Sequence, residues 1–124
     1  MMLPSEFRKL VEEAIDSLPE DILRHLKNVE VLVEWSALPE QKRRVGLRAW
    51  EDLFGLYEGV PLTARGVTSG EPILPDRIII FQRPIERRYR TPERIRDAIR
   101  RTLIHEIAHH FGISDERLRE LDAY

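Results

Sequence analysis

The spacing of apolar side chains predicts two helices at the start of the chain. Residues 5–18 carry apolar side chains three and four positions apart, which places them on one helix face. These are Phe7, Leu10, Val11, Ala14, Ile15 and Leu18. Ser5 can cap this helix and Pro19 breaks the chain after it. Residues 20–27 then predict a short second helix.

Three later segments have the pattern of β-strands. Residues 29–35 alternate Val29, Val31, Val33 and Trp35 with other side chains, which predicts a strand with one buried face. Residues 53–57 are a second candidate, and residues 78–81 form the strongest one because they are three isoleucines and a phenylalanine. Pro84 cannot donate to a sheet ladder, so it favours a strand end or an edge position nearby.

Two segments between the strands predict loops. Residues 36–50 are polar and contain Pro39, which indicates a loop with at most a short helix. Residues 58–77 contain three glycines and three prolines, which predicts a long loop. Loops of this length are often lids or binding loops, but a mobile hairpin tip has the same composition.

The longest predicted helix runs from Thr91 to Phe111. Threonine suits the N-cap, Pro92 suits the first turn, and Gly112 can end the helix in the left-handed conformation. Ser114 can cap a final short helix. The order of elements predicts an α+β fold with a small β-sheet packed on helices, in one domain over residues 1–124.

Composition narrows the class of protein. The 124 residues suit one globular domain, with 42% hydrophobic and 34% charged side chains and a net charge of -2. This charge gives no reason to expect nucleic acid or a membrane as partner. No apolar run approaches the ~20 residues of a membrane span, and the N-terminus lacks an apolar signal core, so we expect a cytoplasmic protein. Arginine outnumbers lysine 17 to 3, which is typical of a thermophile or of a GC-rich genome.

The segment LIHEIAHHFGISD, residues 103–115, points to metal chemistry. Because the chain has no cysteine, a bound metal would need His, Asp or Glu ligands. His105 and His109 are four apart, so on a helix both imidazoles can bind one ion. Glu106 is turned by about 100° from His105 and can approach a metal-bound water without being a ligand. Gly112 lets the chain turn, so that the Asp115 carboxylate can return toward the histidines as a third ligand.

Helical phase indicates where these histidines point. The apolar stripe of the long helix consists of Ile99, Leu103, Ile104, Ile107, Ala108 and Phe111. His105 and His109 fall nearly opposite its centre and therefore face a cleft or solvent. The alternative interpretation is a polar helix face without metal. His110 lies on the flank of the stripe, where it can orient a metal ligand or, as we prefer, be partly buried and bonded to backbone.

A resemblance starts at these residues. His105-Glu106-x-x-His109-x-x-Gly112-x-x-Asp115 resembles the extended zincin motif of metzincin-type peptidases, with aspartate as third ligand. Together with LFGLYEGVPLT and RIIIFQRPIE upstream, it is similar to a family of very small bacterial zincin-like metallopeptidases. The resemblance implies a minimal zincin-like fold with a long active-site helix. It also implies Zn²⁺ bound by His105, His109 and Asp115, with Glu106 as general base.

The resemblance also implies a sheet edge that pairs with an extended substrate, for which residues 78–82 are our candidate. Larger metzincins have a methionine turn beneath the metal, whereas this chain has only Met1 and Met2, so the floor of the site must be built differently.

The hypothesis is hydrolysis of a peptide bond in a peptide or protein by a zinc-activated water, whose proton Glu106 accepts. The same ligand set also suits non-haem iron, but the H-E-x-x-H spacing favours zinc. Tyr57, Tyr89 and Tyr124 could stabilise the oxyanion by their chemistry alone, and each is more simply a packed or surface tyrosine.

Two alternatives come from other classes of protein. The first is a zinc-binding module without turnover, in which the metal serves folding or partner binding. The second is a protein that binds nucleic acid or an acidic partner through clustered arginines. These are Arg83, Arg87, Arg88, Arg90, Arg94, Arg96, Arg100 and Arg101. Glu86, Glu93 and Asp97 are interleaved, which favours a solvated, ion-paired face.

Overall fold

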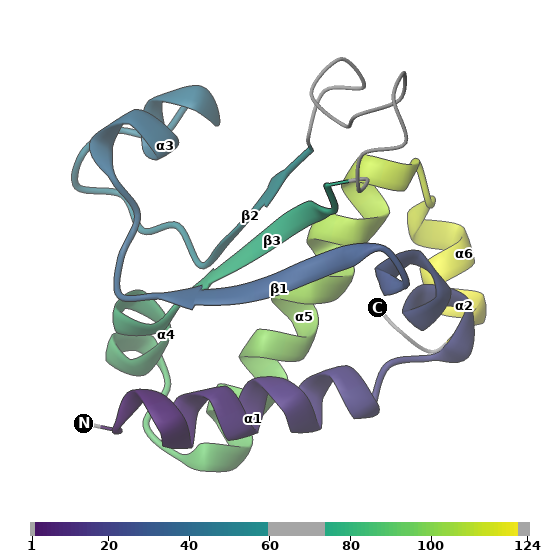
Figure 1. Cartoon of the computed structure of the whole chain (residues 1–124), viewed down its shortest axis with the longest axis horizontal. Helices are drawn as coiled ribbons and strands as arrows, with labels where there is room; N and C mark the ends of the chain where they lie inside the picture. Colours follow the sequence, from purple (N-terminus) through teal and green to yellow (C-terminus); the bar gives the residue numbers. More distant parts are fainter. Residues whose placement is uncertain (1, 60–73, 122–124) are drawn as a thin grey trace.

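A three-stranded sheet covered by helices forms the fold in the computed structural model, which describes residues 2–59 and 74–121 (Figure 1). The elements in chain order are α1 (Pro4–Asp16), α2 (Glu20–Leu23), the 3-10 helix η1 (Arg24–Leu26), β1 (Val29–Glu34), α3 (Pro39–Arg44), β2 (Gly55–Glu58), β3 (Asp76–Phe81), α4 (Gln82–Arg88), α5 (Pro92–Phe111) and α6 (Asp115–Glu120). The predicted α+β fold is confirmed. Most of the predicted long loop, residues 60–73, lies outside the described residues. Among the described residues no helix has the length and apolarity to cross a membrane.

The strands lie in the order β1-β3-β2. β1 runs parallel to β3, with Val31 opposite Ile78, and β2 runs antiparallel to β3, with Tyr57 also opposite Ile78. The prediction that residues 78–82 form a substrate-binding edge is therefore wrong, because β3 is paired on both sides and Gln82 begins α4. β3 carries apolar side chains on both faces, as a strand in the centre of a sheet requires.

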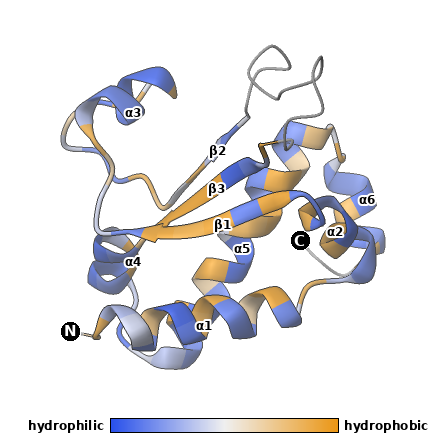
Figure 2. Ribbon diagram, in the orientation of Figure 1, coloured by the Kyte–Doolittle hydropathy of each residue, from blue (hydrophilic) through white to orange (hydrophobic). Residues whose placement is uncertain are grey.

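Alternate side chains of β3 enter two apolar clusters. Ile78 and Ile80 are fully buried in the main core between the sheet, α1 and α5. Ile79 and Phe81 point to the opposite face, where they pack with Leu56 of β2. Figure 2 shows the apolar colouring concentrated on β1, β3 and the inner sides of α1 and α5. The main core therefore holds α5 firmly against the sheet.

α4 was not predicted from the sequence. Pro84 lies in its first turn, where a missing N–H costs nothing, rather than at the end of a strand. The Gln82 side chain is buried and donates to the Met2 carbonyl at 3.2 Å and to Glu86 Oε2 at 3.2 Å. The Met2 N–H donates to Glu86 Oε1 at 2.7 Å, so α4 fastens the beginning of the chain.

The boundaries of α5 and α6 match the predictions from their cap residues. Thr91 Oγ1 accepts from the Arg94 N–H, and Ser114 Oγ accepts from the Arg117 N–H. Gly112 ends α5 with φ +69°, a left-handed conformation that glycine adopts without steric cost. The local rules of capping thus fix both ends of the segment that carries the histidines.

Candidate functional site

β2 and α5 approach each other closely at the site. A Cβ atom on Gly55 would lie 2.5 Å from Thr102 Cγ2 of α5, so any other residue would force Thr102 or the strand to shift. Two residues farther along β2, the Tyr57 N–H donates to Glu106 Oε1 at 3.2 Å. Thr102 and Glu106 are four apart on α5, a rise of about 6 Å that matches the ~6.7 Å between alternate strand residues. The contacts between α5 and β2 therefore recur at matching spacings along both elements.

The strand register explains why the Tyr57 N–H binds a side chain rather than β3. The Phe81 N–H donates to the Phe54 carbonyl, and in an antiparallel pair such bonded positions alternate with positions whose N–H points away. Tyr57 is three residues after Phe54, so its N–H points away from β3. The Glu106 carboxylate is bound at the outer side of β2.

Glu106 is half-buried between α5 and β2. Burial raises the pKa of its carboxyl above the usual value, whereas the hydrogen bond from Tyr57 and the nearby His109 act to lower it. A carboxylate with these surroundings is held in place and is a stronger proton acceptor than an exposed one.

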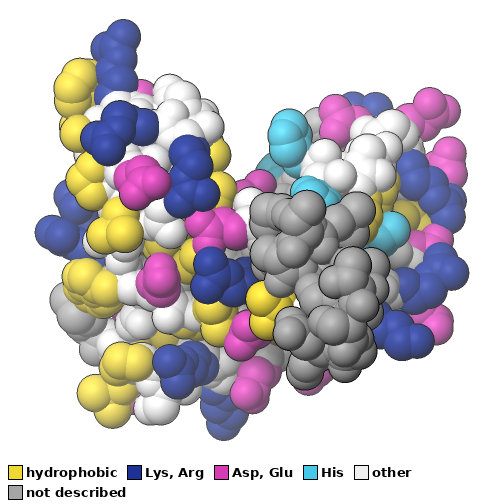
Figure 3. All heavy atoms as spheres, turned by 45° about the horizontal axis from the view of Figure 1, so that its top comes forward, with side chains coloured by type: hydrophobic (Ala, Val, Ile, Leu, Met, Phe, Trp, Pro, Cys, Tyr) yellow, Lys and Arg dark blue, Asp and Glu magenta, His cyan; other side chains and the backbone are white. Residues whose placement is uncertain are grey.

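His105 and His109 are exposed on α5, whereas Ile107 and Ala108 beside them are buried. The prediction that both histidines face away from the core is confirmed. Histidine side chains reach the surface on the face drawn in Figure 3. Imidazoles four positions apart on one helix face can approach one metal ion, so the ligand roles of His105 and His109 stay a prediction.

Asp115 is the first residue of α6 and is exposed. After Gly112 the Ile113 N–H returns to the Ala108 carbonyl at 2.9 Å, so the chain does turn where predicted. Over residues 2–59 and 74–121, however, no three His, Asp or Glu side chains are gathered closely enough to hold a metal ion. His105 and His109 share the exposed face of α5, but the structure does not gather Asp115 with them, and the roles of all three residues as ligands stay predictions.

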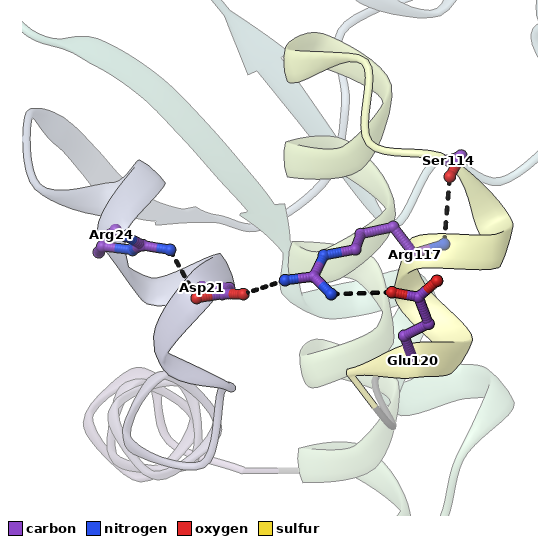
Figure 4. Close-up of polar contacts among 5 residues, drawn as sticks. All are labelled: Asp21, Arg24, Ser114, Arg117 and Glu120. Carbon is purple, nitrogen blue, oxygen red and sulfur yellow. Dashed lines mark hydrogen bonds and ion pairs between the residues drawn. The ribbon is translucent and has the colours of Figure 1, made fainter.

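A salt-bridge network fixes α6, which carries Asp115. Arg117 binds Asp21 of α2 at 2.6 Å and Glu120 at 2.9 Å, and Asp21 also binds Arg24 (Figure 4). Leu118 of α6 is buried in the main core. The exposed ion pairs contribute little energy, so the burial of Leu118 is the main contact that holds α6 on the core.

The sequence missed the surroundings of His110. Its ring stacks on Tyr57 at 3.8 Å between centroids, and its Nε2 lies 4.0 Å from Asp76 Oδ2. The Tyr57 hydroxyl donates to the same Asp76 oxygen at 2.6 Å, so it is already engaged and is not a free oxyanion donor. The His110 side chain is 41% exposed and is covered in part by Tyr57 and Phe111. Within the described residues it makes no hydrogen bond to backbone, so that part of the preferred interpretation is wrong.

Phe111 closes the aromatic group beside the site. It was expected in the apolar stripe of α5, but it is exposed and packs at the surface against His25 of η1, with ring centroids 4.4 Å apart. It also meets the Tyr57 and His110 rings edge-on. Only the strand register brings Tyr57 here, which is why helical periodicity could not predict this group.

Comparison with models of protein families matches residues 26–124 to the zincin-like metallopeptidase family. The matched region starts at the end of η1 and includes the whole sheet, α5 and α6. No curated protein matches the chain.

Proposed function

Since the chain belongs to the zincin-like metallopeptidase family, we propose that it is a zinc-dependent peptidase that hydrolyses peptide bonds beside α5. The observation that supports this most strongly is the position of Glu106. Its half-buried carboxylate is held by the Tyr57 N–H, one residue from one exposed histidine and three from the other. A polar helix face without function would need no such arrangement.

The donor set fits zinc in kind, since two imidazoles and one carboxylate are typical of a catalytic zinc site. We propose that His105 and His109 are the first two ligands and that Asp115 is the third. Asp115 reaches the metal by a movement of the short link between Gly112 and α6, where the left-handed glycine gives the backbone freedom. Zinc held by these residues would lower the pKa of a bound water molecule and polarise the scissile carbonyl.

In the proposed reaction Glu106 acts as general base. Its carboxylate accepts a proton from the attacking water and transfers it to the leaving nitrogen of the peptide bond. Release of Glu106 from the Tyr57 N–H makes that donor available to a substrate carbonyl. The outward backbone groups of β2, in place of residues 78–82, are then the edge along which an extended peptide lies.

The test combines metal content with turnover. Protein without a histidine tag is analysed for bound metal beside the double variant His105→Ala/His109→Ala and the control His25→Ala, which removes a histidine outside the ligand set. We expect one zinc per chain in the wild type and the control, and none in the double variant. Equal zinc in all three proteins would refute the site.

A matched pair of variants then distinguishes a peptidase from a zinc-binding module without turnover. Glu106→Gln keeps the size of the side chain but cannot accept the proton, so we expect zinc binding to persist and hydrolysis of a peptide library to fall by ~10²–10⁴-fold. Glu116→Gln, on exposed α6, should leave both unchanged. Equal turnover in Glu106→Gln and the wild type would exclude the catalytic role, and zinc binding without any turnover in the wild type would favour the module.

A further inference from the structure

The arginine-rich segment has an excess of positive charge that the fold does not neutralise. Residues 83–101 contain eight arginines and three carboxylates, a net charge of +5 in a chain of net charge -2. Within the described residues only Arg96 of this group has an acidic partner, Glu13 at 3.7 Å. The prediction of an ion-paired face is therefore wrong for the other seven arginines. These are Arg83, Arg87, Arg88, Arg90, Arg94, Arg100 and Arg101.

The carboxylates between these arginines form no ion pairs with them, because the fold engages one elsewhere and leaves the other two exposed. Glu86 accepts hydrogen bonds from the Met2 N–H and the Gln82 side chain instead of from an arginine. Glu93 and Asp97 are exposed and make no ion pair within the described residues. The guanidinium groups thus keep their donors available to a ligand.

Tyr89, in the link between α4 and α5, separates two cavities that these arginines line. One has a volume of about 690 Å³ and includes Arg83, Arg87, Arg90, Trp35 and Tyr89 in its walls. The other has a volume of about 530 Å³ and is lined by Arg88, Tyr89, Arg94, Asp97, Arg100 and Arg101. The guanidinium carbons of Arg88 and Arg101 lie 5.5 and 5.6 Å from the centroid of the Tyr89 ring. Stacking on this ring orients two of the guanidinium groups at the border of the second cavity.

We propose that the walls of these two cavities, which together form the arginine surface, bind an acidic segment of a polypeptide. Guanidinium groups match carboxylates in bidentate geometry, and the aromatic walls of Trp35 and Tyr89 suit the apolar side chains between acidic residues. A nucleic acid fits less well, because Glu6, Glu86 and Asp97 interrupt the positive charge of the cavity walls. A polypeptide can place uncharged residues opposite these carboxylates, whereas a nucleic acid carries a phosphate at every nucleotide.

Arg94 and Arg101 of the arginine surface lie on the same side of α5 as His105. At about 100° per residue, Arg94, Arg101 and His105 fall within ~40° of one another around the helix axis. From Arg94 to His105 the helix rises about 16 Å, which an extended peptide of ~5 residues spans. One polypeptide can therefore hold both places. In combination with the proposed peptidase function, on which this step rests, the arginine surface selects substrates with an acidic segment near the cleaved bond.

The test measures binding without turnover. Fluorescence anisotropy with the full chain compares a labelled glutamate-rich peptide with the same peptide carrying glutamine in place of glutamate. We expect the acidic peptide to bind the wild type and Glu106→Gln equally, more weakly at high salt, and at least about tenfold more tightly than the glutamine peptide. Arg94→Gln/Arg101→Gln should lose at least about tenfold of this affinity. The control Lys27→Gln/Arg43→Gln removes two exposed cations elsewhere and should keep it.

Three results would overturn the proposal. The first is equal affinity for the acidic and glutamine peptides, and the second is equal loss in the arginine and control variants. The third is tighter binding of single-stranded RNA that disappears in Arg94→Gln/Arg101→Gln, which would assign the surface to nucleic acid. Thermal unfolding by circular dichroism confirms that each variant is folded. Because no readout depends on hydrolysis, failure here and failure of the peptidase proposal are separate.

Discussion

The two ends of α5 carry charged and polar side chains, but they differ in what those side chains contact. At the C-terminal end Glu106 and His110 are tied to Tyr57 through a backbone N–H and a stacked ring. At the N-terminal end Arg94 and Arg100 make no ion pair within the described part of the chain. The first end is therefore organised by the protein itself, whereas the second has donors left for a partner.

This difference shows that residue type alone does not identify a site. In sequence, the arginines at the N-terminal end predict a solvated, ion-paired face, whereas the spacing of His105, Glu106 and His109 at the C-terminal end predicts a metal site. Contacts distinguish the two ends in the structure. The Tyr57 N–H of β2 donates to Glu106, whereas within the described residues only Arg96 of the eight arginines in residues 83–101 has an acidic partner. Substitutions at the C-terminal end should accordingly change metal binding and stability, while those at the N-terminal end should change neither.

The largest expected effect is the loss of the proposed third ligand. Asp115→Ala should weaken zinc affinity by more than about a hundredfold, because loss of an outer partner of a ligand already costs ~10–100-fold. Glu116→Ala, the adjacent exposed carboxylate, is the matched control and should bind zinc like the wild type. Competition with a zinc-binding dye measures both. Equal affinity in the two variants would remove Asp115 from the ligand set.

The contact between β2 and α5 should be the next most sensitive. In Gly55→Ala the new methyl group meets Thr102 Cγ2 and overpacks the contact, so we expect the free energy of unfolding to fall by ~1–3 kcal/mol. Thr102→Ser removes that methyl and keeps the hydroxyl, which donates to the Ala98 carbonyl. In the double variant Gly55→Ala/Thr102→Ser, urea unfolding should show that most of the lost free energy of unfolding is recovered. If none is recovered, the clash lies instead with the Ile79 carbonyl, 3.2 Å away.

The turn after α5 can be tested against an equivalent glycine elsewhere. Gly112 and Gly46 both have positive φ, +69° and +80°, and at both positions an added methyl group would have no atom within 4 Å. Alanine at either position should therefore cost a similar ~1–2 kcal/mol of unfolding free energy from backbone strain alone. Only Gly112→Ala should also weaken zinc binding, because only it changes the approach of Asp115. Equal zinc affinity in both variants would contradict the proposed movement.

The smallest effect is expected at the N-terminal end of α5. Arg94→Gln should change the free energy of unfolding by less than ~0.5 kcal/mol, because the side chain is exposed and has no ion pair within the described residues to lose. Tyr57→Phe, at the other end, removes the 2.6 Å hydrogen bond to Asp76 and should cost about 0.5–1.5 kcal/mol. Thermal unfolding of the two variants side by side would show whether the two ends differ as described.

Local signals predicted α1, α5, α6 and the histidine face, although they did not predict α4. Thr91, Gly112 and Ser114 act through neighbours within a few residues, so their caps could be derived from sequence, and the phase of α5 placed His105 and His109 correctly outside the core. The strands were also predicted. β3 was the clearest of them, because its run of isoleucines must be buried whichever strands it pairs with.

What the sequence could not provide depended on pairing between distant segments. The central place of β3 follows from how β1 and β2 dock, and periodicity along one strand does not contain that information. The contacts of Tyr57 with Glu106, His110 and Asp76 need the same register. The arginines were expected to find the nearby acids, but Glu86 binds Met2, far away in sequence.

The hydrogen bond between Tyr57 and Glu106 has a consequence for self-association. β2 is a strand at the edge of a sheet, and an unprotected edge can pair with the edge of another copy and seed aggregation. The Glu106 carboxylate accepts the outward N–H of Tyr57 at the middle of β2. The next residue, Glu58, forms ion pairs with Arg44 and Arg77. The Glu106 side chain, proposed as the general base, should thus also hinder edge-to-edge pairing of β2 between two copies of the chain.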